Sequence, residues 1–554
     1  MKASISLRRN VRFDREAQLI LAFSVLAFLF KLYLLSKRSL YLDPDEGYYL
    51  VLARNIFHGK AYGFNGLPNI IFPPVLPIAI AFVHFFVHDF QMSLNIITAL
   101  SGAFLGIIVY LIARKKMSPG ASFGCFLLAL FSQELNAFLP AALRYSQVLY
   151  RGSDILNCCL VLASVYFLIR LVEKNRYFPA VFAGFFLALA YLTRPEGFIL
   201  FAGLLGMLVF MKSFSLVALS WKRILSLVLV FLALAFPYVF YLKKVSGQWT
   251  LSGKISASQR YRAALLQVIQ KEDWQPFNRA HYSLNGAATE MNDLYFGYHE
   301  AADEELEVPT DPAGKIICSN LRLYGIIPKT LVPWQLLLFF LLGLGGSLLR
   351  LIKKRSLPDM LLLSLVPYSL VIEALSYPIP RHHLFLVPVV ILYGGQGALF
   401  FSSWVSCNNE VTKRKVLFLV FAVLFALAVN DQIMYSSKNL LNNPLFITAR
   451  KIEASEARRL KEARAEVVMS SHPNLAVWAS SDWQVLPQAP LPAQIEFGKN
   501  KHVDAAVLTG EKRPFFHILD FRNSRLPERL GDPFDIQVVE SDEYYDIVRV
   551  MKKE

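Results

Sequence analysis

The chain has 554 residues, of which 55% are hydrophobic and only 18% are charged, and its mean hydropathy is +0.42. These values lie outside the usual range for soluble globular domains. Because the charges gather in short clusters between long apolar runs, the composition predicts many membrane spans and excludes one large soluble core. The net charge of +16 does not indicate nucleic-acid binding, since the basic clusters flank apolar segments, where they orient a membrane protein.

The apolar runs predict a polytopic α-helical membrane protein with about eleven transmembrane helices and up to about thirteen, since a span needs roughly 20 apolar residues. The first run follows an arginine-rich start and has no small-residue cleavage site after it, so it is expected to remain as the first helix. The expected spans are 18–36, 92–113, 121–139, 155–171, 177–192, 197–211, 224–242, 331–349, 358–376, 383–402 and 416–430.

The basic clusters orient these spans. With the N-terminus in the cytoplasm, the clusters that follow alternate spans all lie inside: 114–116, 170–176, 212–223, 350–355 and 413–415. The external loops are then 37–91, 140–154 and 243–330. This orientation requires that the stretch Pro73–Val87, which contains three prolines, does not cross the membrane. We expect it to form an interfacial or re-entrant helix on the external side.

Two parts follow from this topology: a transmembrane domain, residues 1–439, and an external soluble domain, residues 440–554. The second part has a charged helical stretch at 450–464 and then short β-like runs at 466–469, 505–508 and 536–539. This order predicts a small α/β domain. No internal repeat is evident, which weighs against a secondary transporter built from repeated halves.

An acidic segment directly after the first span is the strongest candidate site. Asp43, Asp45 and Glu46 are three carboxylates within four residues at an external membrane boundary, where charges are costly unless they are used. One of them could act as general base toward an acceptor hydroxyl. Asp43 and Asp45 could instead hold a divalent cation, or the segment could be a solvated loop in which Asp43 caps a helix.

Further polar groups fall on the same external face. Arg151 precedes the fourth span, and Asp154 lies at its start. Arg194 and Glu196 belong to the turn before the sixth span, and Arg381 opens the tenth. An arginine at this boundary is a good phosphate ligand. The alternatives are that Asp154 caps its helix, that Arg194 and Glu196 pair with each other, and that Arg381 reaches lipid headgroups.

This ordered set resembles the C-type membrane glycosyltransferases, in the branch of the protein O-mannosyltransferases and the lipid A aminoarabinose transferases. The resemblance covers residues 18–210 well and 377–400 moderately. Its matching features are Asp45-Glu46 after the first span, Pro73-Pro74, Asp154, the turn 193–197 and Arg381.

The resemblance implies transfer of a sugar from a polyprenyl-phosphate carrier on the external face. By position, Asp45 is the general base and Asp154 lines the acceptor side, and Glu46 is counted with them as a catalytic residue. Arg381 steadies the departing phosphate. Several relatives carry a lysine where this chain has Phe72, so other basic residues are expected to contribute to phosphate binding: Lys60, Arg144, Arg151 and Arg194.

The same resemblance implies the partners and the location. The donor is a lipid-linked hexose, pentose or aminosugar, and the acceptor is a lipid, a glycan or a protein, with no nucleic acid involved. No cofactor is obligatory, although a divalent cation is possible. The implied location is the bacterial inner membrane, with the C-terminal domain outside. A transporter or flippase of lipid-linked saccharides is the alternative, but charges at the external rim favour an enzyme.

Overall fold

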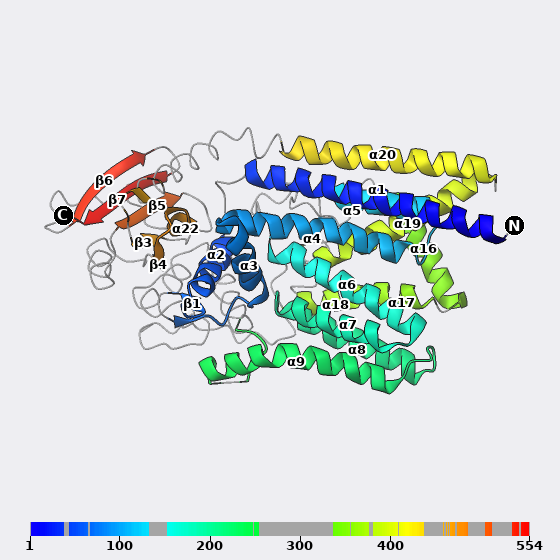
Figure 1. The fold of residues 1–554 in the computed structure, drawn as a ribbon, viewed down its shortest axis with the longest axis horizontal. Coiled ribbons are helices and arrows are strands. Elements are labelled where there is room, and N and C mark those ends of the chain that lie inside the picture. Colours follow the sequence, from blue (N-terminus) through cyan, green and yellow to red (C-terminus); the bar gives the residue numbers. More distant parts are fainter. Residues whose placement is uncertain are drawn as a thin grey trace, which may run out of the picture.

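A computed structural model of the chain describes its membrane part and several strands of its C-terminal part. The described residues are 2–37, 44–64, 67–131, 152–247, 249–253, 336–354, 356–375, 380–407, 409–436, 458, 461–462, 464, 466–470, 474–485, 505–511, 534–541 and 545–552. These residues are mostly helical (Figure 1).

A bundle of long helices forms the larger part of the molecule (Figure 1). Its members are α1 (Lys2–Lys37), α4 (Phe90–Ala113), α5 (Pro119–Phe131), α6 (Ser153–Lys174), α7 (Tyr177–Tyr191), α8 (Glu196–Ser213), α9 (Trp221–Ser246), α16 (Leu337–Lys354), α17 (Leu357–Leu363), α18 (Leu365–Leu375), α19 (Val387–Val405) and α20 (Glu410–Ser436). Each expected span overlaps a helix, but 358–376 is divided at Ser364 into α17 and α18, and 383–402 begins in the 3₁₀ helix η2 (Pro380–Leu386) before α19. Residues 132–139, 331–335 and 376 of the expected spans lie outside the described residues.

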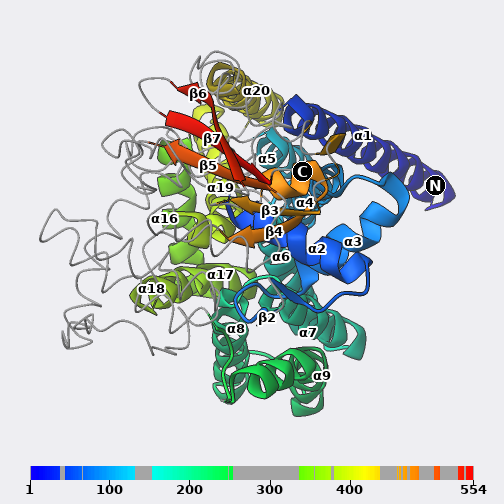
Figure 2. The ribbon, with the colours of Figure 1, turned by 90° about the vertical axis from the view of Figure 1, so that its left-hand side faces the viewer.

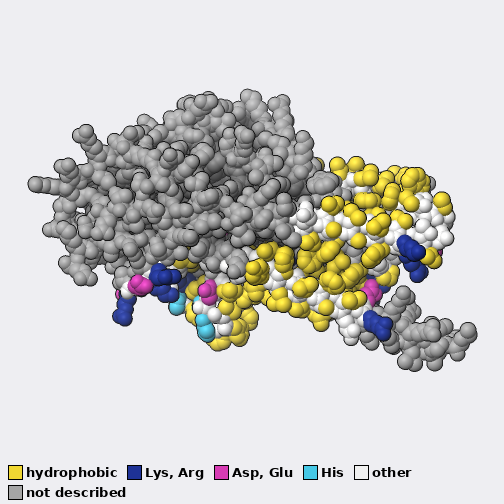
Figure 3. All heavy atoms as spheres, turned by 90° about the horizontal axis from the view of Figure 1, so that it is seen from above, with side chains coloured by type: hydrophobic (Ala, Val, Ile, Leu, Met, Phe, Trp, Pro, Cys, Tyr) yellow, Lys and Arg dark blue, Asp and Glu magenta, His cyan; other side chains and the backbone are white. Residues whose placement is uncertain are grey.

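The composition of these helices fits a membrane. Six helices in the described part are long and apolar enough to cross it, and further apolar helices are shorter. On α9, Leu225, Leu229 and Phe236 point outward, and apolar side chains cover most of the described surface visible in Figure 3. Exposed apolar surface of this extent is typical of helices that face lipid.

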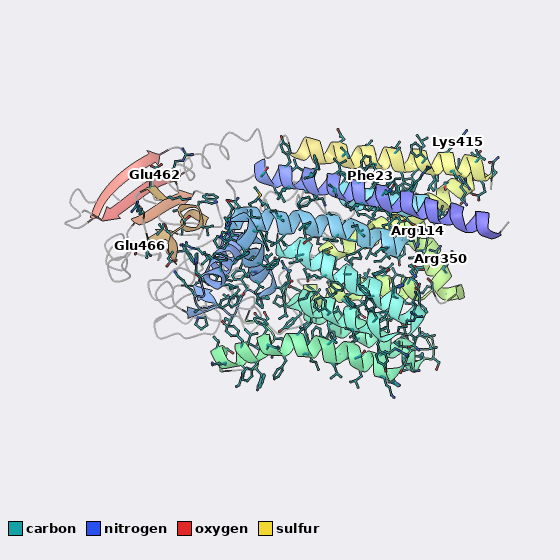
Figure 4. All side chains as sticks on the ribbon, viewed as in Figure 1. Phe23, Arg114, Arg350, Lys415, Glu462 and Glu466 are labelled. Atoms are coloured by element: carbon teal, nitrogen blue, oxygen red, sulfur yellow. The ribbon has the colours of Figure 1, made fainter. Side chains whose placement is uncertain are left out.

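Basic residues gather at one end of the bundle. Figure 4 shows Arg114, Arg350 and Lys415 at this end, whereas Glu462 and Glu466 lie at the other. The three basic residues belong to three of the clusters expected in the cytoplasm, so their shared end agrees with the charge-based orientation.

A buried ion pair joins helices at this basic end. Lys116, in the turn after α4, donates to Asp359 of α17, and the Tyr393 hydroxyl of α19 also donates to Asp359, at 3.2 Å. Burial lowers the pKa of Lys116 to about 8, and the Asp359 carboxylate opposes this shift. The pair therefore ties the α4–α5 turn to α17 and α19.

Two helices cover the opposite end of the bundle. These are α2 (Pro44–Phe57) and α3 (Val75–Val87), which are separated by the short strands β1 (Gly63–Phe64) and β2 (Leu67–Pro68). With 13 residues, α3 is about 20 Å long, shorter than a hydrocarbon core of about 30 Å, as are the described parts of α5 and α7. Figures 1 and 2 show α2 and α3 together at the end of α4. The helix exposes Ile78, Phe82, Phe85 and Phe86, as an interfacial helix should.

A mixed sheet lies within the part expected to be external. Its strands are β3 (Val467–Ser470), β4 (Asp482–Val485), β5 (Ala505–Glu511), β6 (Phe534–Ser541) and β7 (Tyr545–Lys552), in the order β4-β3-β5-β7-β6. The first three pair in parallel and the last three antiparallel. A short helix, α22 (Asn474–Ala479), connects β3 to β4. The runs expected at 466–469, 505–508 and 536–539 overlap β3, β5 and β6, whereas most of 450–464 and 243–330 lies outside the described residues.

Close packing of α16 on α19 depends on glycine. A Cβ atom added to Gly343 would overlap the Tyr393 carbonyl oxygen, whereas one added to Gly345 would meet nothing within 4 Å. Small residues commonly allow membrane helices to approach in this way. We expect Gly343→Ala to destabilise the protein by about 1–3 kcal/mol, as overpacking does. Thermal denaturation in detergent should show a lower midpoint for Gly343→Ala and no loss for Gly345→Ala. Equal midpoints for the two variants would contradict this packing.

Candidate active site

The acidic segment opens helix α2. Pro44 begins the helix, where its missing N–H is not needed, and Asp45 and Glu46 follow in the same turn. The side chain of Glu46 is buried. Asp43 and the side chain of Asp45 lie outside the described residues, so the structure places the backbone of Asp45 but not its carboxylate.

A loop stabilised by Asn69 lies against α2. The buried Asn69 side chain accepts hydrogen bonds from the backbone N–H groups of Ile71, at 3.1 Å, and Phe72, at 3.2 Å, and donates to the Phe72 carbonyl at 2.8 Å. The Phe72 ring packs against Tyr48 and Tyr49, at 5.4 and 5.0 Å between centroids. The position where several relatives carry lysine is therefore an apolar contact between this loop and α2.

The loop also joins α3 to the turn between α7 and α8. The backbone N–H of Val75, the first residue of α3, donates to the Leu192 carbonyl at 3.0 Å. Arg194 lies two residues further along that turn. This bond brings the segment containing the paired prolines to the turn that contains Arg194.

Arg194 is at the centre of a buried cluster of charges. Its Nη1 donates to the Asp154 carboxylate and, at 3.5 Å, to Ser153 Oγ, while Nη2 and Nε face Glu196 at 3.3 and 3.4 Å. Burial alone would lower the pKa of Arg194, but Asp154 and Glu196 raise it above its ordinary value, and Tyr49 adds to this effect. The arginine is thus held as a cation between α6, α8 and α2.

This cluster decides between the alternatives given for Asp154 and for the Arg194–Glu196 pair. Asp154 is in the first turn of α6, but the N-cap residue is Gly152, so Asp154 pairs with Arg194 rather than capping its helix. Arg194 and Glu196 do pair, but not only with each other. Arg144 and Arg151 lie outside the described residues.

Arg381 belongs to the 3₁₀ helix η2 (Pro380–Leu386), which precedes α19. The Cys158 thiol of α6 donates to the Leu384 carbonyl of η2 at 3.8 Å, and Cys158 is one turn after Asp154. The backbones of Asp45 and Arg381 therefore lie at the same end of the bundle, as a shared site requires. The Arg381 side chain is outside the described residues.

Lys60 faces the C-terminal part of the chain. Its ammonium contacts both carboxylate oxygens of Asp482, at 2.8 and 3.1 Å, and the side chain is 51% exposed. The structure therefore brings Asp154, Arg194 and Glu196 together, whereas Lys60 pairs with Asp482.

Comparison with known proteins agrees with the fold. Residues 71–241 match the model of the dolichyl-phosphate-mannose-protein mannosyltransferase family. Over nearly its full length the chain superimposes on ArnT from Cupriavidus metallidurans, with a TM-score of 0.56, 13% identity, and coverage of 96% of this chain and 97% of ArnT. The chain has the fold of the C-type membrane glycosyltransferases. The resemblance inferred from the sequence is thereby confirmed.

Other C-type glycosyltransferase structures share this fold. ArnT bound to undecaprenyl phosphate gives a TM-score of 0.54 at 13% identity, with coverage of 96% and 97%. The Archaeoglobus fulgidus oligosaccharyltransferase in complex with Zn and sulfate gives 0.52 at 14% identity, with coverage of 88% of this chain and 67% of that chain. No curated protein sequence matches the chain.

Proposed function

We propose that this protein, which has the fold of the C-type glycosyltransferases, transfers a sugar from a polyprenyl-phosphate carrier to an acceptor on the external face of the membrane. Asp45 is the proposed general base. The observation that supports this proposal is that α2, the Asp154–Arg194 pair and η2 lie at one end of the bundle: Tyr49 of α2 packs on Phe72, whose loop is bonded to the turn of Arg194, and α6 contacts η2. The ArnT structure with undecaprenyl phosphate supports a lipid-phosphate donor. The structure of an oligosaccharyltransferase tethered with an acceptor peptide matches this chain at a TM-score of 0.50. It supports the proposal that a protein of this fold also binds an acceptor.

The proposed mechanism uses groups of this chain. Asp45 removes the proton from the acceptor hydroxyl, the resulting oxygen attacks the anomeric carbon, and the bond to the carrier phosphate breaks. The departing phosphate gains negative charge, which Arg381 stabilises. Glu46, which is buried beside Asp45 in the chain, is a further proposed catalytic residue, and Asp154 lines the acceptor side. Because Arg194 is bound to two carboxylates, its proposed contribution to phosphate binding requires a change of partners.

The proposal also covers the other phosphate ligands, the substrates and the location of the protein. Arg151 and Lys60 are candidate phosphate ligands, the latter only when it leaves Asp482. The transferred sugar is a hexose, a pentose or an aminosugar, and the acceptor is a lipid, a glycan or a protein. The proposed location is the bacterial inner membrane, with the N-terminus in the cytoplasm and residues 440–554 outside.

The direct test is incubation of the purified protein with a panel of labelled polyprenyl-phosphate sugars and an extract of envelope lipids, glycans and proteins. We expect one donor to yield a labelled acceptor together with free polyprenyl phosphate. If no donor is cleaved while reconstituted vesicles move the labelled lipid between leaflets, the flippase alternative is correct.

Metal dependence has its own prediction. An arginine can stabilise the departing phosphate, so we expect activity to persist after treatment with EDTA. The alternative is a cation held by Asp43 and Asp45. Loss of activity in EDTA followed by recovery on addition of Mg²⁺ or Mn²⁺ would contradict the prediction and favour that alternative.

A further inference from the structure

The segment from α22 to β4 docks on helix α2. Trp483 of β4 packs edge-on against Tyr48 of α2, at 5.4 Å between centroids, and against Phe64 of β1, at 6.3 Å. The Trp483 side chain is only 6% exposed. An aromatic contact with so little exposed area stabilises an interface.

Hydrogen bonds fix the same interface. Arg54 of α2 donates from Nη1 to the Ser481 carbonyl and from Nη2 to the Ser480 carbonyl at 2.7 Å, and it lies 3.8 Å from Asp482. Lys60 pairs with Asp482 on the exposed side. Because Arg54 binds two successive carbonyl groups, it recognises the backbone shape of the turn before β4.

A second helix is held by the same segment. Trp478 of α22 donates from Nε1 to the Gln91 side chain at 3.0 Å, and Gln91 lies in the first turn of α4. The α22–β4 segment thus contacts both α2 and α4. It restrains the orientation of α2 relative to the bundle.

The orientation of α2 matters because two successive side chains join it to its neighbours. Tyr48 contacts both Trp483 of the docked segment and Phe72, and Tyr49 contacts Phe72 at 5.0 Å between centroids. The first turn of the same helix carries Asp45 and Glu46. A rigid helix transmits any tilt along its length, so undocking at Tyr48 displaces the acidic turn.

We infer that Trp483, Arg54 and Trp478 are positioning residues for sugar transfer: they hold α2 so that its acidic turn keeps its place beside the Asp154–Arg194 pair. This inference rests on the proposed function. A displacement of about 1 Å at reacting groups can cost about 100-fold in rate. We expect undocking to lower kcat by roughly 10-fold while the KM for the donor changes less than about twofold.

The test compares Trp483→Ala with Trp404→Ala in the full chain. Trp404, at the end of α19, is 75% exposed, so its removal is the matched control. Two measurements are made: hydrogen exchange of the amides of α2, and kcat and KM with the active donor. We expect faster exchange and lower kcat for Trp483→Ala, neither change for Trp404→Ala, and recovery in Trp483→Phe.

A milder variant guards against misfolding. Trp478→Phe removes only the hydrogen bond to Gln91, so it should show a smaller change in the same direction. Unchanged exchange in Trp483→Ala would overturn the docking, and faster exchange with unchanged kcat would overturn the positioning role. If the wild type transfers no sugar, the proposed function fails, but exchange still decides the docking.

Discussion

Replacing Asp45 by asparagine is expected to abolish sugar transfer while the protein still accumulates at the normal level. Asparagine has the shape of aspartate but cannot accept the acceptor's proton, and loss of a general base typically costs 10²–10⁴-fold. The substitution falls in the first turn of α2 and does not change the size of the side chain. The measurement is initial rate with the active donor, alongside the yield of protein in the membrane.

Two further variants define what a loss of activity means. Glu410→Gln at the start of α20 removes an exposed carboxylate and should not change the rate. Asp43→Asn distinguishes a general base at Asp45 from a cation held by Asp43 and Asp45. If the two residues share a cation, Asp43→Asn and Asp45→Asn should lose activity equally, and a higher Mg²⁺ concentration should restore it. Full activity in Asp45→Asn would remove Asp45 as the base and leave Glu46 and Asp154 to be tested.

The membrane helices were predictable because their signals are local. Long apolar runs and basic clusters predict spans and orientation without knowledge of packing, and the prolines around residues 73–77 led to the prediction of an interfacial helix where the structure has the short helix α3. The division between α17 and α18 has a local signal that the prediction did not use. Pro367 lies in the first turn of α18 and has no N–H to donate to the Leu363 carbonyl, so a continuous helix is interrupted here.

The partners of the charged residues were less predictable. Arg194 and Asp154 are 40 positions apart, and the sequence placed both on the external face without showing that they meet. Lys60 and Asp482 come from parts of the chain whose contact no periodicity records. Asn69 was missed, although an asparagine shortly before paired prolines is a turn signal.

The burial of Lys31 was not predicted from the apolar run that contains it. Lys31 of α1 is buried and its Nζ lies close to Gly102 of α4, where an added Cβ would be 2.5 Å away. Its Nζ has no hydrogen-bond partner among the described residues. A lysine near the end of a predicted span is normally expected to reach the membrane surface, so hydropathy alone could not predict this packing.

Replacing Arg194 by methionine is expected to lower the stability of the fold by about 3–5 kcal/mol, the usual cost of removing one partner from a buried ion pair. Methionine keeps much of the side chain's length but leaves Asp154, which is only 5% exposed, without its arginine. Thermal denaturation in detergent measures the effect. The matched control is Arg176→Met, because Arg176 is exposed and surface substitutions usually change stability by less than about 0.5 kcal/mol.

A double variant and a conservative one separate the structural role of Arg194 from phosphate binding. Removing both charges, with Asp154→Asn and Arg194→Met, should cost less than the sum of the two single changes, because each single change strands the other group. Arg194→Lys retains a cation but not the fork that reaches Ser153, Asp154 and Glu196 together, so it too should be less stable. If Arg194→Lys instead keeps the wild-type denaturation midpoint and raises only the KM for the donor, the arginine acts on the carrier phosphate and the buried pair is not what holds α6 to the α7–α8 turn.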